Sequence, residues 1–154
     1  MVNNLDLGES VYNKYVGTLQ IHEIHDDGNV IIRKAPNIIT YDAREILAYL
    51  LAGDNLVDRY VKYLQVGDDV TAPTRNDTTL ANSVDTVGVT YTFPLVDRVQ
   101  FEAILPNVTP ANGSTLREAG LFNNSGKMFS RQVHGDIAKT SAIQLKYIWT
   151  IIFT

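Results

Sequence analysis

The chain has 154 residues, of which 45% are hydrophobic and 19% charged, with a formal net charge of −4 and no cysteine. This length suits one ordinary domain, and the missing cysteines exclude disulfides and thiolate metal sites. Binding to nucleic acid rests on Lys and Arg neutralising phosphates, so an acidic chain without basic runs argues against a nucleic-acid partner.

The first 14 residues are polar and aperiodic, and we interpret them as an N-terminal arm of a single β-rich domain at residues 15–154. They contain no basic region followed by an apolar one, as a signal peptide would. No apolar stretch approaches the ~20 residues that span a bilayer. We therefore expect a soluble protein that is made in the cytoplasm and has no membrane partner.

The first predicted element is a hairpin, because the β-rich runs Tyr15–His25 and Val30–Lys34 flank a short turn at residues 26–29. That turn, Asp26-Asp27-Gly28-Asn29, and the later Gly67-Asp68-Asp69 offer the oxygens that Ca²⁺ prefers. The same residues are also the ones that turns favour, and no EF-hand glutamate follows. We interpret both segments as turns.

One helix is predicted within Asn37–Gly53. Asp42 and Glu45 have the spacing of an N-cap and its capping-box partner, and Gly53 is placed as the C-terminal stop. Four residues at helical spacing are expected to form its buried face: Ile46, Leu47, Leu50 and Leu51.

The middle of the chain alternates strands and loops. Tyr60–Val66, Val84–Phe93 and Asp97–Leu105 are predicted strands, whereas Thr71–Asn82 and Pro106–Ser114 are predicted loops, the first of them exposed. The strand before Pro106 has one apolar face: Val99, Phe101, Ala103 and Leu105.

Thr115–Phe122 and Lys127–Val133 are expected to form another hairpin, and Ala142–Phe153 alternates most regularly. Trp149 should anchor the core from this last strand. Ile148 and Ile152 break the alternation, so we expect them to meet the helix or a neighbouring subunit.

These elements amount to seven or eight strands and one short α-helix near residues 42–52. The regular spacing of the strands and their turn-rich connections favour a mainly β fold, an antiparallel β-sandwich or a barrel-like domain.

The search for catalytic chemistry yields little. His22 and His25 are three apart on a predicted strand and point to opposite faces, while His134 lies near a strand end. No nucleophile elbow, phosphate-binding glycine loop or zinc-protease motif occurs. We predict no enzyme, no cofactor and no metal site.

Arg117 and Glu118 are adjacent charges within an otherwise apolar run. Neighbours on a strand face opposite ways, so each needs its own partner. They are either part of an inter-subunit ion pair or surface charges of little energetic weight.

Several short motifs together resemble a group of small proteins encoded in bacteriophage and prophage tail modules. The resemblance covers about residues 37–153, although Asp68 and Asp69 depart from it. The motifs follow one another in this order: Asn37-Ile38-Ile39-Thr40-Tyr41-Asp42-Ala43-Arg44, Leu64-Gln65-Val66-Gly67, Thr71-Ala72-Pro73-Thr74, Asp77-Thr78, Leu80, Leu116-Arg117-Glu118-Ala119-Gly120-Leu121-Phe122, Met128-Phe129-Ser130-Arg131, Ile137-Ala138-Lys139 and Trp149-Thr150-Ile151.

The resemblance implies a non-enzymatic structural subunit of a virion, in the tail, baseplate or fibre attachment. It would be a homo-oligomer in contact with other phage structural proteins. It also makes Arg117 and Glu118 candidates for structurally fixed partners. A capsid decoration or head-fibre protein is the close alternative. A carbohydrate- or receptor-binding β-sandwich is another, and four tyrosines are candidates for its site: Tyr12, Tyr15, Tyr91 and Tyr147.

Overall fold

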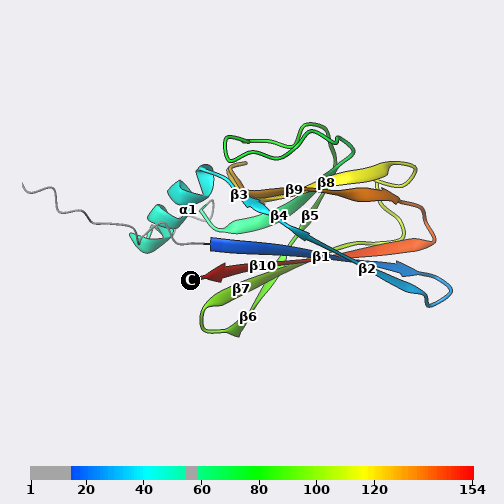
Figure 1. Ribbon diagram of the computed structural model, residues 1–154, viewed down its shortest axis with the longest axis horizontal. Helices are drawn as coiled ribbons and strands as arrows, with labels where there is room; N and C mark the ends of the chain where they lie inside the picture. Colours follow the sequence, from blue (N-terminus) through cyan, green and yellow to red (C-terminus); the bar gives the residue numbers. More distant parts are fainter. Residues whose placement is uncertain (1–14, 55–58) are drawn as a thin grey trace, which may run out of the picture.

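The computed structural model describes residues 15–54 and 59–154, which form two antiparallel five-stranded sheets facing each other (Figure 1). This confirms the predicted mainly β fold, and the two separate sheets make the described residues a sandwich instead of a closed barrel. The elements are β1 (Tyr15–His25), β2 (Val30–Pro36), β3 (Ile38–Ile39), α1 (Asp42–Leu51), β4 (Val61–Gly67), β5 (Ser83–Gly88), β6 (Thr90–Leu95), β7 (Arg98–Leu105), β8 (Thr115–Asn123), β9 (Met128–Ala138) and β10 (Ile143–Phe153).

Sheet A has the strand order β2-β1-β10-β7-β6, and sheet B has the order β3-β9-β8-β4-β5. The two ends of the described chain meet in the middle of sheet A, where β1 pairs with β10 from Tyr15 opposite Phe153 to His25 opposite Ile143. The predicted arm, residues 1–14, lies outside the described residues.

The chain passes directly from one sheet to the other along both lateral edges. Val89 links β5 of sheet B to β6 of sheet A, so the single predicted strand Val84–Phe93 is in fact two. On the other edge, Asn37 links β2 to β3, and its side chain bonds to Ser130 of β9. That side chain lies against Gly17, where a Cβ would fall 1.6 Å from its Oδ1.

The core between the sheets is built from the alternating faces that the sequence predicts. On β10 the inward residues from Ile143 to Ile151 are buried, and Trp149 is completely enclosed. The predicted apolar face of the neighbouring strand β7 lies beside them on the same side of sheet A, with Ala103 paired to Tyr147 and Phe101 to Trp149. Burial of these large side chains is the main stabilising contribution to the domain.

The helix is shorter than Asn37–Gly53 and is capped differently at its start. Asp42 is the first helical residue, and the predicted Asp42–Glu45 capping box is wrong, because the N-cap is Tyr41 and has no side-chain cap. The Ala43 amide instead donates to the Thr40 hydroxyl at 3.4 Å. Glu45 pairs with Lys127.

The end of the helix is as predicted. Gly53 has a φ of +72°, and the amides of Gly53 and Asp54 donate back to the carbonyls of Leu50 and Tyr49. This is a Schellman ending, which glycine accommodates best. Of the predicted buried face, Ile46 is enclosed but Leu51 is 91% exposed.

The connection between β4 and β5, residues 68–82, folds back over the outer face of sheet B, as the green loop above β8 and β9 in Figure 1 shows. Most of its side chains are exposed, in line with the prediction, but Leu80 is buried against Phe122 and Met128. Close approach is permitted at Gly120, where a Cβ would fall 3.1 Å from the Leu80 side chain. We call residues 68–82 the covering loop.

Candidate functional site

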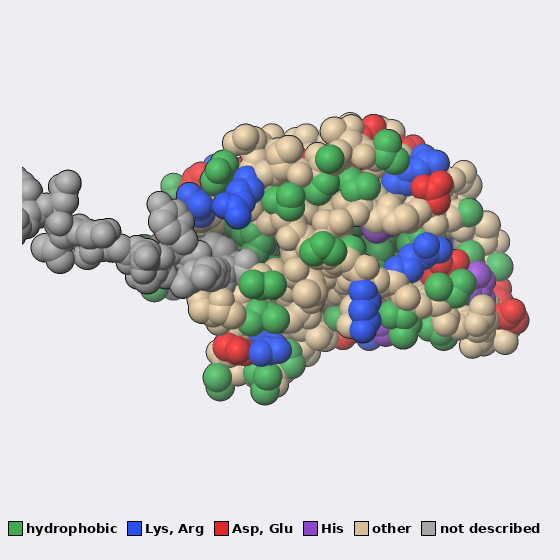
Figure 2. All heavy atoms as spheres, viewed as in Figure 1, with side chains coloured by type: hydrophobic (Ala, Val, Ile, Leu, Met, Phe, Trp, Pro, Cys, Tyr) green, Lys and Arg blue, Asp and Glu red, His purple; other side chains and the backbone are tan. Residues whose placement is uncertain are grey.

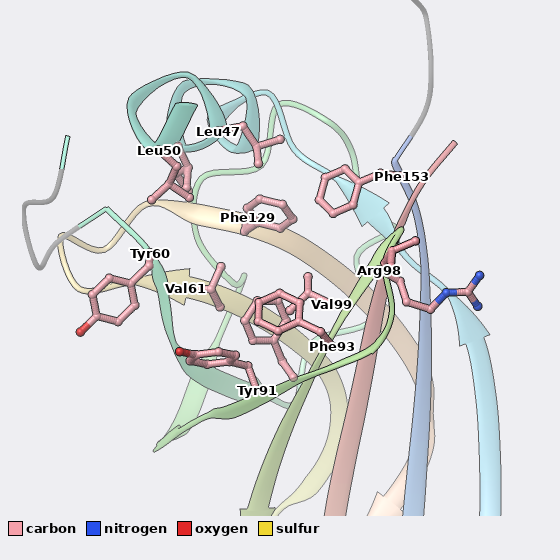
Figure 3. Close-up of a pocket in the computed structure, with 13 residues that line it drawn as sticks. Leu47, Leu50, Tyr60, Val61, Tyr91, Phe93, Arg98, Val99, Phe129 and Phe153 are labelled. Atoms are coloured by element: carbon pink, nitrogen blue, oxygen red, sulfur yellow. The ribbon is translucent and has the colours of Figure 1, made fainter. Parts of the chain in front are cut away.

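An apolar cleft of about 610 Å³ opens at the end of the sandwich that carries α1. Figure 3 shows Leu47 and Leu50 of the helix forming one wall, with Tyr91 and Phe93 of β6 on the opposite side and Phe129 of β9 between them. The lining comes from α1, β4, β6, β7, β9 and β10: Ile46, Leu47, Leu50, Tyr60, Val61, Tyr91, Phe93, Val96, Arg98, Val99, Phe101, Phe129 and Phe153.

The cleft offers almost no polar chemistry. Among the residues that the structure describes, Arg98 is the one charged residue in its lining, and its guanidinium points away from the cleft in Figure 3. That group donates to Asp97 at 2.7 Å and, through this hydrogen bond, lowers the pKa of Asp97. Apart from Arg98, the polar side-chain groups of the described lining are the Tyr60 and Tyr91 hydroxyls, so it suits mainly apolar ligand groups.

The rim of the cleft is unusually apolar and exposed. Figure 2 shows hydrophobic side chains gathered around one acidic and basic pair, over the β6–β7 hairpin. Every residue of β6 is exposed, including Phe93 at 71%. Contiguous apolar surface of this kind typically marks an interaction site. We call the following residues the end surface: Leu50, Tyr60, Tyr91, Phe93, Leu95, Val96 and Phe153.

A second cluster is charged and buried, and it fastens the covering loop to sheet B. Arg131 of β9 donates to Glu118 of β8 at 2.8 Å, to Asp77 at 2.7 Å and to the Thr71 carbonyl at 3.0 Å. Glu118 in turn accepts from the backbone amides of Ala81 at 3.3 Å and Asn82 at 2.9 Å. We call Arg131, Glu118 and Asp77 the loop clamp.

Hydrogen bonds within the loop clamp favour the charged forms of Arg131 and Asp77. Burial alone would lower the pKa of Arg131, but hydrogen bonds to Asp77 and Glu118 outweigh that effect and raise it. Burial would likewise raise the pKa of Asp77, yet hydrogen bonds from Thr74 and Arg131 lower it. Both shifts stabilise the ion pair, so we interpret the clamp as a structural device.

Arg117 and Glu118 both find partners within the chain, at an irregular point of β8 where the pairing with β9 shifts register. Glu118 is completely buried in the loop clamp, unlike the surface charge considered from the sequence. Arg117 is partly exposed and donates to Asp136 at 2.9 Å and to the Asp68 carbonyl at 3.1 Å. Their role at a subunit interface stays a prediction.

Ile148 and Ile152 lie on the outer face of sheet A, opposite to the core face that carries Trp149. The helix is on the core side, where Leu47 and Leu50 share the cleft with Phe153. The expected contact of the two isoleucines with the helix is therefore wrong. Both are half-buried among neighbours on the adjacent strands, and their contact with another subunit stays a prediction.

The histidines do not converge on a site in the described residues. His22 bonds to Gln20 and His25 to Glu23, on opposite faces of β1 as predicted. His134 is buried beside Tyr147, with ring centroids 6.1 Å apart, and its Nδ1 lies 2.9 Å from the Gly135 carbonyl. Burial lowers the pKa of His134, so its ring is neutral at neutral pH.

The two acidic segments are turns. In the first, Asp27 accepts a hydrogen bond from the Asn29 amide and Gly28 has a φ of +85°. In the second, Asp69 accepts from the Thr71 amide at 2.6 Å. Among the described residues, no group of three His, Cys, Asp or Glu side chains is placed to hold a metal ion.

Of the four tyrosines that were candidates for a carbohydrate-binding site, the structure shows one on an accessible surface. Tyr147 is completely buried, which excludes it from a binding surface. Tyr12 and the side chain of Tyr15 lie outside the described residues. Tyr91 is 60% exposed and lines the cleft together with Tyr60, which the sequence did not single out.

Comparison with protein-family models, with curated proteins and with solved structures finds no match for this chain. The resemblance to phage tail-module proteins therefore stays a prediction. None of the described helices is long and apolar enough to cross a membrane.

Proposed function

We propose that this protein is a non-enzymatic structural subunit of a bacteriophage virion, made in the host cytoplasm and placed in the tail, baseplate or fibre attachment. It works by binding other subunits. The observation that carries the proposal is the end surface, an exposed apolar area around a mostly apolar cleft. A surface of this composition is stabilised when another protein covers it.

The loop clamp gives further support, because it explains why separate motifs of the resemblance occur together. Thr71, Asp77, Glu118 and Arg131 belong to four different motifs, and all four meet at one point. A clamp that holds a loop on a sheet gives a subunit a rigid outer face, which suits assembly by repeated contacts.

The direct test is labelling of particles. An antibody against the purified chain is applied to phage particles released from the strain that encodes it, and bound gold is located by electron microscopy. Label at the tail or baseplate is the expected result. Particles that contain no copy of the chain, by labelling and by mass spectrometry, would refute the proposal.

A capsid decoration or head-fibre protein belongs to the same structural class and uses the same kind of contact. The same micrographs distinguish it, because the label would then lie on the head.

A carbohydrate- or receptor-binding module is the second candidate, and the exposed rings of Tyr91 and Phe93 favour it. Their centroids are 5.6 Å apart, on the rim of the cleft. Exposed aromatic rings beside a polar group can stack on sugar faces. Binding on a glycan array that Tyr91→Ala abolishes would support this function over the structural one.

A further inference from the structure

We infer that the end surface binds a second copy of this chain, with the β6–β7 turn of each copy seated in the cleft of the other. The inference rests on the proposed function, in which this protein binds other subunits, and it names the partner and the parts that make contact. It follows from a projecting apolar turn and an apolar cavity that lie side by side on one molecule.

The projecting part is the two-residue turn Val96–Asp97 between β6 and β7. Val96 is fully exposed at 109%, and Leu95 beside it is 55% exposed. The turn is held in place because the Phe153 amide donates to the Asp97 carbonyl at 2.8 Å. An apolar turn that is already fixed loses little conformational entropy on binding.

The charges at the turn do not oppose its burial. Asp97 and Arg98 pair with each other through two hydrogen bonds, at 2.7 and 3.1 Å. A turn that carries its own neutralised pair brings no net charge toward the apolar lining of a partner. Burial of an unpaired charge would instead be strongly unfavourable.

The cleft beside the β6–β7 turn is apolar like the turn itself, and its volume is about 610 Å³. Val96 lies on the rim of the same cleft, so the projection and the cavity belong to one continuous surface. In a two-fold dimer the same patch is used by both copies, and a projection beside a cavity is then matched twice. A different partner would have to supply its own projection.

The composition of the end surface suits the core of a dimer interface. A standard interface buries about 800 Å² on each partner, and its core is rich in aromatic residues. The end surface contributes seven large hydrophobic side chains, four of them aromatic.

Side-chain docking is favoured over the addition of a strand to β6. Pro94 lies in this edge strand and has no amide hydrogen to donate. The pairing of β6 with β7 is also irregular between Thr92 and Leu95. A partner strand would therefore find a broken row of hydrogen-bonding groups, whereas the apolar side chains remain accessible.

The test uses the full chain in analytical ultracentrifugation from about 1 μM to about 1 mM, a range that covers weak and moderate dimers. The expected result is a dimer. Val96→Asp alters the turn and Leu50→Asp alters the helical wall of the cleft, and both side chains are exposed in the single chain. Each change occurs twice in the dimer, so at about tenfold per position the dissociation constant should rise about 100-fold.

Two further measurements sharpen the result. Val108→Asp is the matched control: Val108 is 82% exposed in the loop after β7, at the other end of that strand from the turn, and its variant should dimerise normally. A mixture of Val96→Asp and Leu50→Asp should form heterodimers more tightly than either variant forms homodimers. In the mixture one unaltered turn meets a cleft whose helical wall is unaltered.

A chain that is monomeric throughout the range overturns the inference. So does a dimer that neither variant weakens, or that Val108→Asp weakens equally. Copurification of an apolar small molecule in the cleft of a monomer, or occupation of the cleft by residues 1–14 of the same chain, also counts against it. A monomer that is nevertheless found in virions would refute the dimer and leave the proposed function intact. A dimer that is absent from virions would support the dimer and refute the proposed function.

Discussion

Glu118 and Arg131 form an ion pair of 2.8 Å between adjacent strands β8 and β9, with side chains 0% and 2% exposed. Arg131 lies diagonally across the ladder from Glu118, because Gly120 is its direct partner. Both side chains also hold the covering loop. Replacing either of them leaves a buried charge and a detached loop.

We predict that Glu118→Ala lowers the free energy of unfolding by about 3–5 kcal/mol, since it leaves Arg131 buried with half of its hydrogen bonds. Glu118→Gln should cost less, because its amide oxygen can still accept from the Asn82 amide. Urea denaturation measures both. Arg117→Ala is the control on the same strand, and its partly exposed pair with Asp136 should change the midpoint little. Equal losses for Glu118→Ala and Arg117→Ala would contradict the assigned role of the clamp.

Gly67→Ala should destabilise the protein by about 1–3 kcal/mol, the usual cost of overpacking. A Cβ at Gly67 would fall 2.3 Å from the Asn82 carbonyl and 2.5 Å from Glu118, so the base of the covering loop would have to move. Thermal unfolding by circular dichroism measures the change.

The matched control for that substitution is Gly88→Ala on the neighbouring strand β5. A Cβ there meets nothing within 4 Å, so the variant should be as stable as the original or slightly more so. If Gly67→Ala were as harmless as Gly88→Ala, the close approach of the loop would be refuted.

Tyr147→Phe should leave stability unchanged or raise it by up to about 1 kcal/mol. The Tyr147 hydroxyl is buried and has no hydrogen-bond partner among the described residues, and an unpaired buried hydroxyl is unfavourable. Tyr63→Phe is the comparison, because it removes a hydroxyl that donates to Asn124 at 3.0 Å. A larger loss for Tyr147→Phe than for Tyr63→Phe in urea denaturation would disprove the expectation.

Stability should fall as the pH drops below about 6.5, the ordinary pKa of histidine. Burial lowers the pKa of His134 in the folded state, so the unfolded chain binds that proton more readily. The contribution is therefore present above pH 6.5 and is lost as the pH falls through the folded-state value. Urea midpoints between about pH 5 and pH 7.5 should decline less steeply in His134→Gln. Identical slopes in the two proteins would show that another group is responsible.

The parts of the fold that depend on local pattern could be predicted from the sequence. The alternation of Ile143 to Ile151 sets the inward face of β10, because period two is a property of any strand. The helix ends at Gly53 for an equally local reason, since only the backbone of that residue has to adopt a positive φ. Neither conclusion needs a distant residue.

The errors occur where a distant strand decides the local structure. Asp42 has the residue type of an N-cap. However, β3 pairs with Arg131 and Ser130 of β9, and this pairing fixes the chain just before the helix. The Thr40 hydroxyl then accepts a hydrogen bond from the Ala43 amide. The predicted strand Val84–Phe93 is divided at Val89 because its two halves pair in different sheets, which depends on where those sheets lie. A sequence pattern carries no information on either pairing.

The candidate site was not predictable for a related reason. The cleft brings together side chains from Ile46 to Phe153, and apart from the β6–β7 hairpin its walls are far apart in the sequence. The one local signal is β6, where the large side chains Tyr91, Phe93 and Leu95 alternate with Thr92 and Pro94. All of these residues are exposed in the fold, and exposed apolar side chains gathered in one place are typical of surfaces that contact another molecule.

The pairing of β1 with β10 has a consequence for how this protein is made. These two strands are neighbours in the middle of sheet A, although Tyr15 and Phe153 are at opposite ends of the described chain. While the ribosome is still adding residues before Ile143, β1 lacks its central partner and β7 is exposed along the same side. The nascent chain therefore cannot close its core during elongation, and the hydrophobic strands depend on rapid completion or on chaperones until β10 is released.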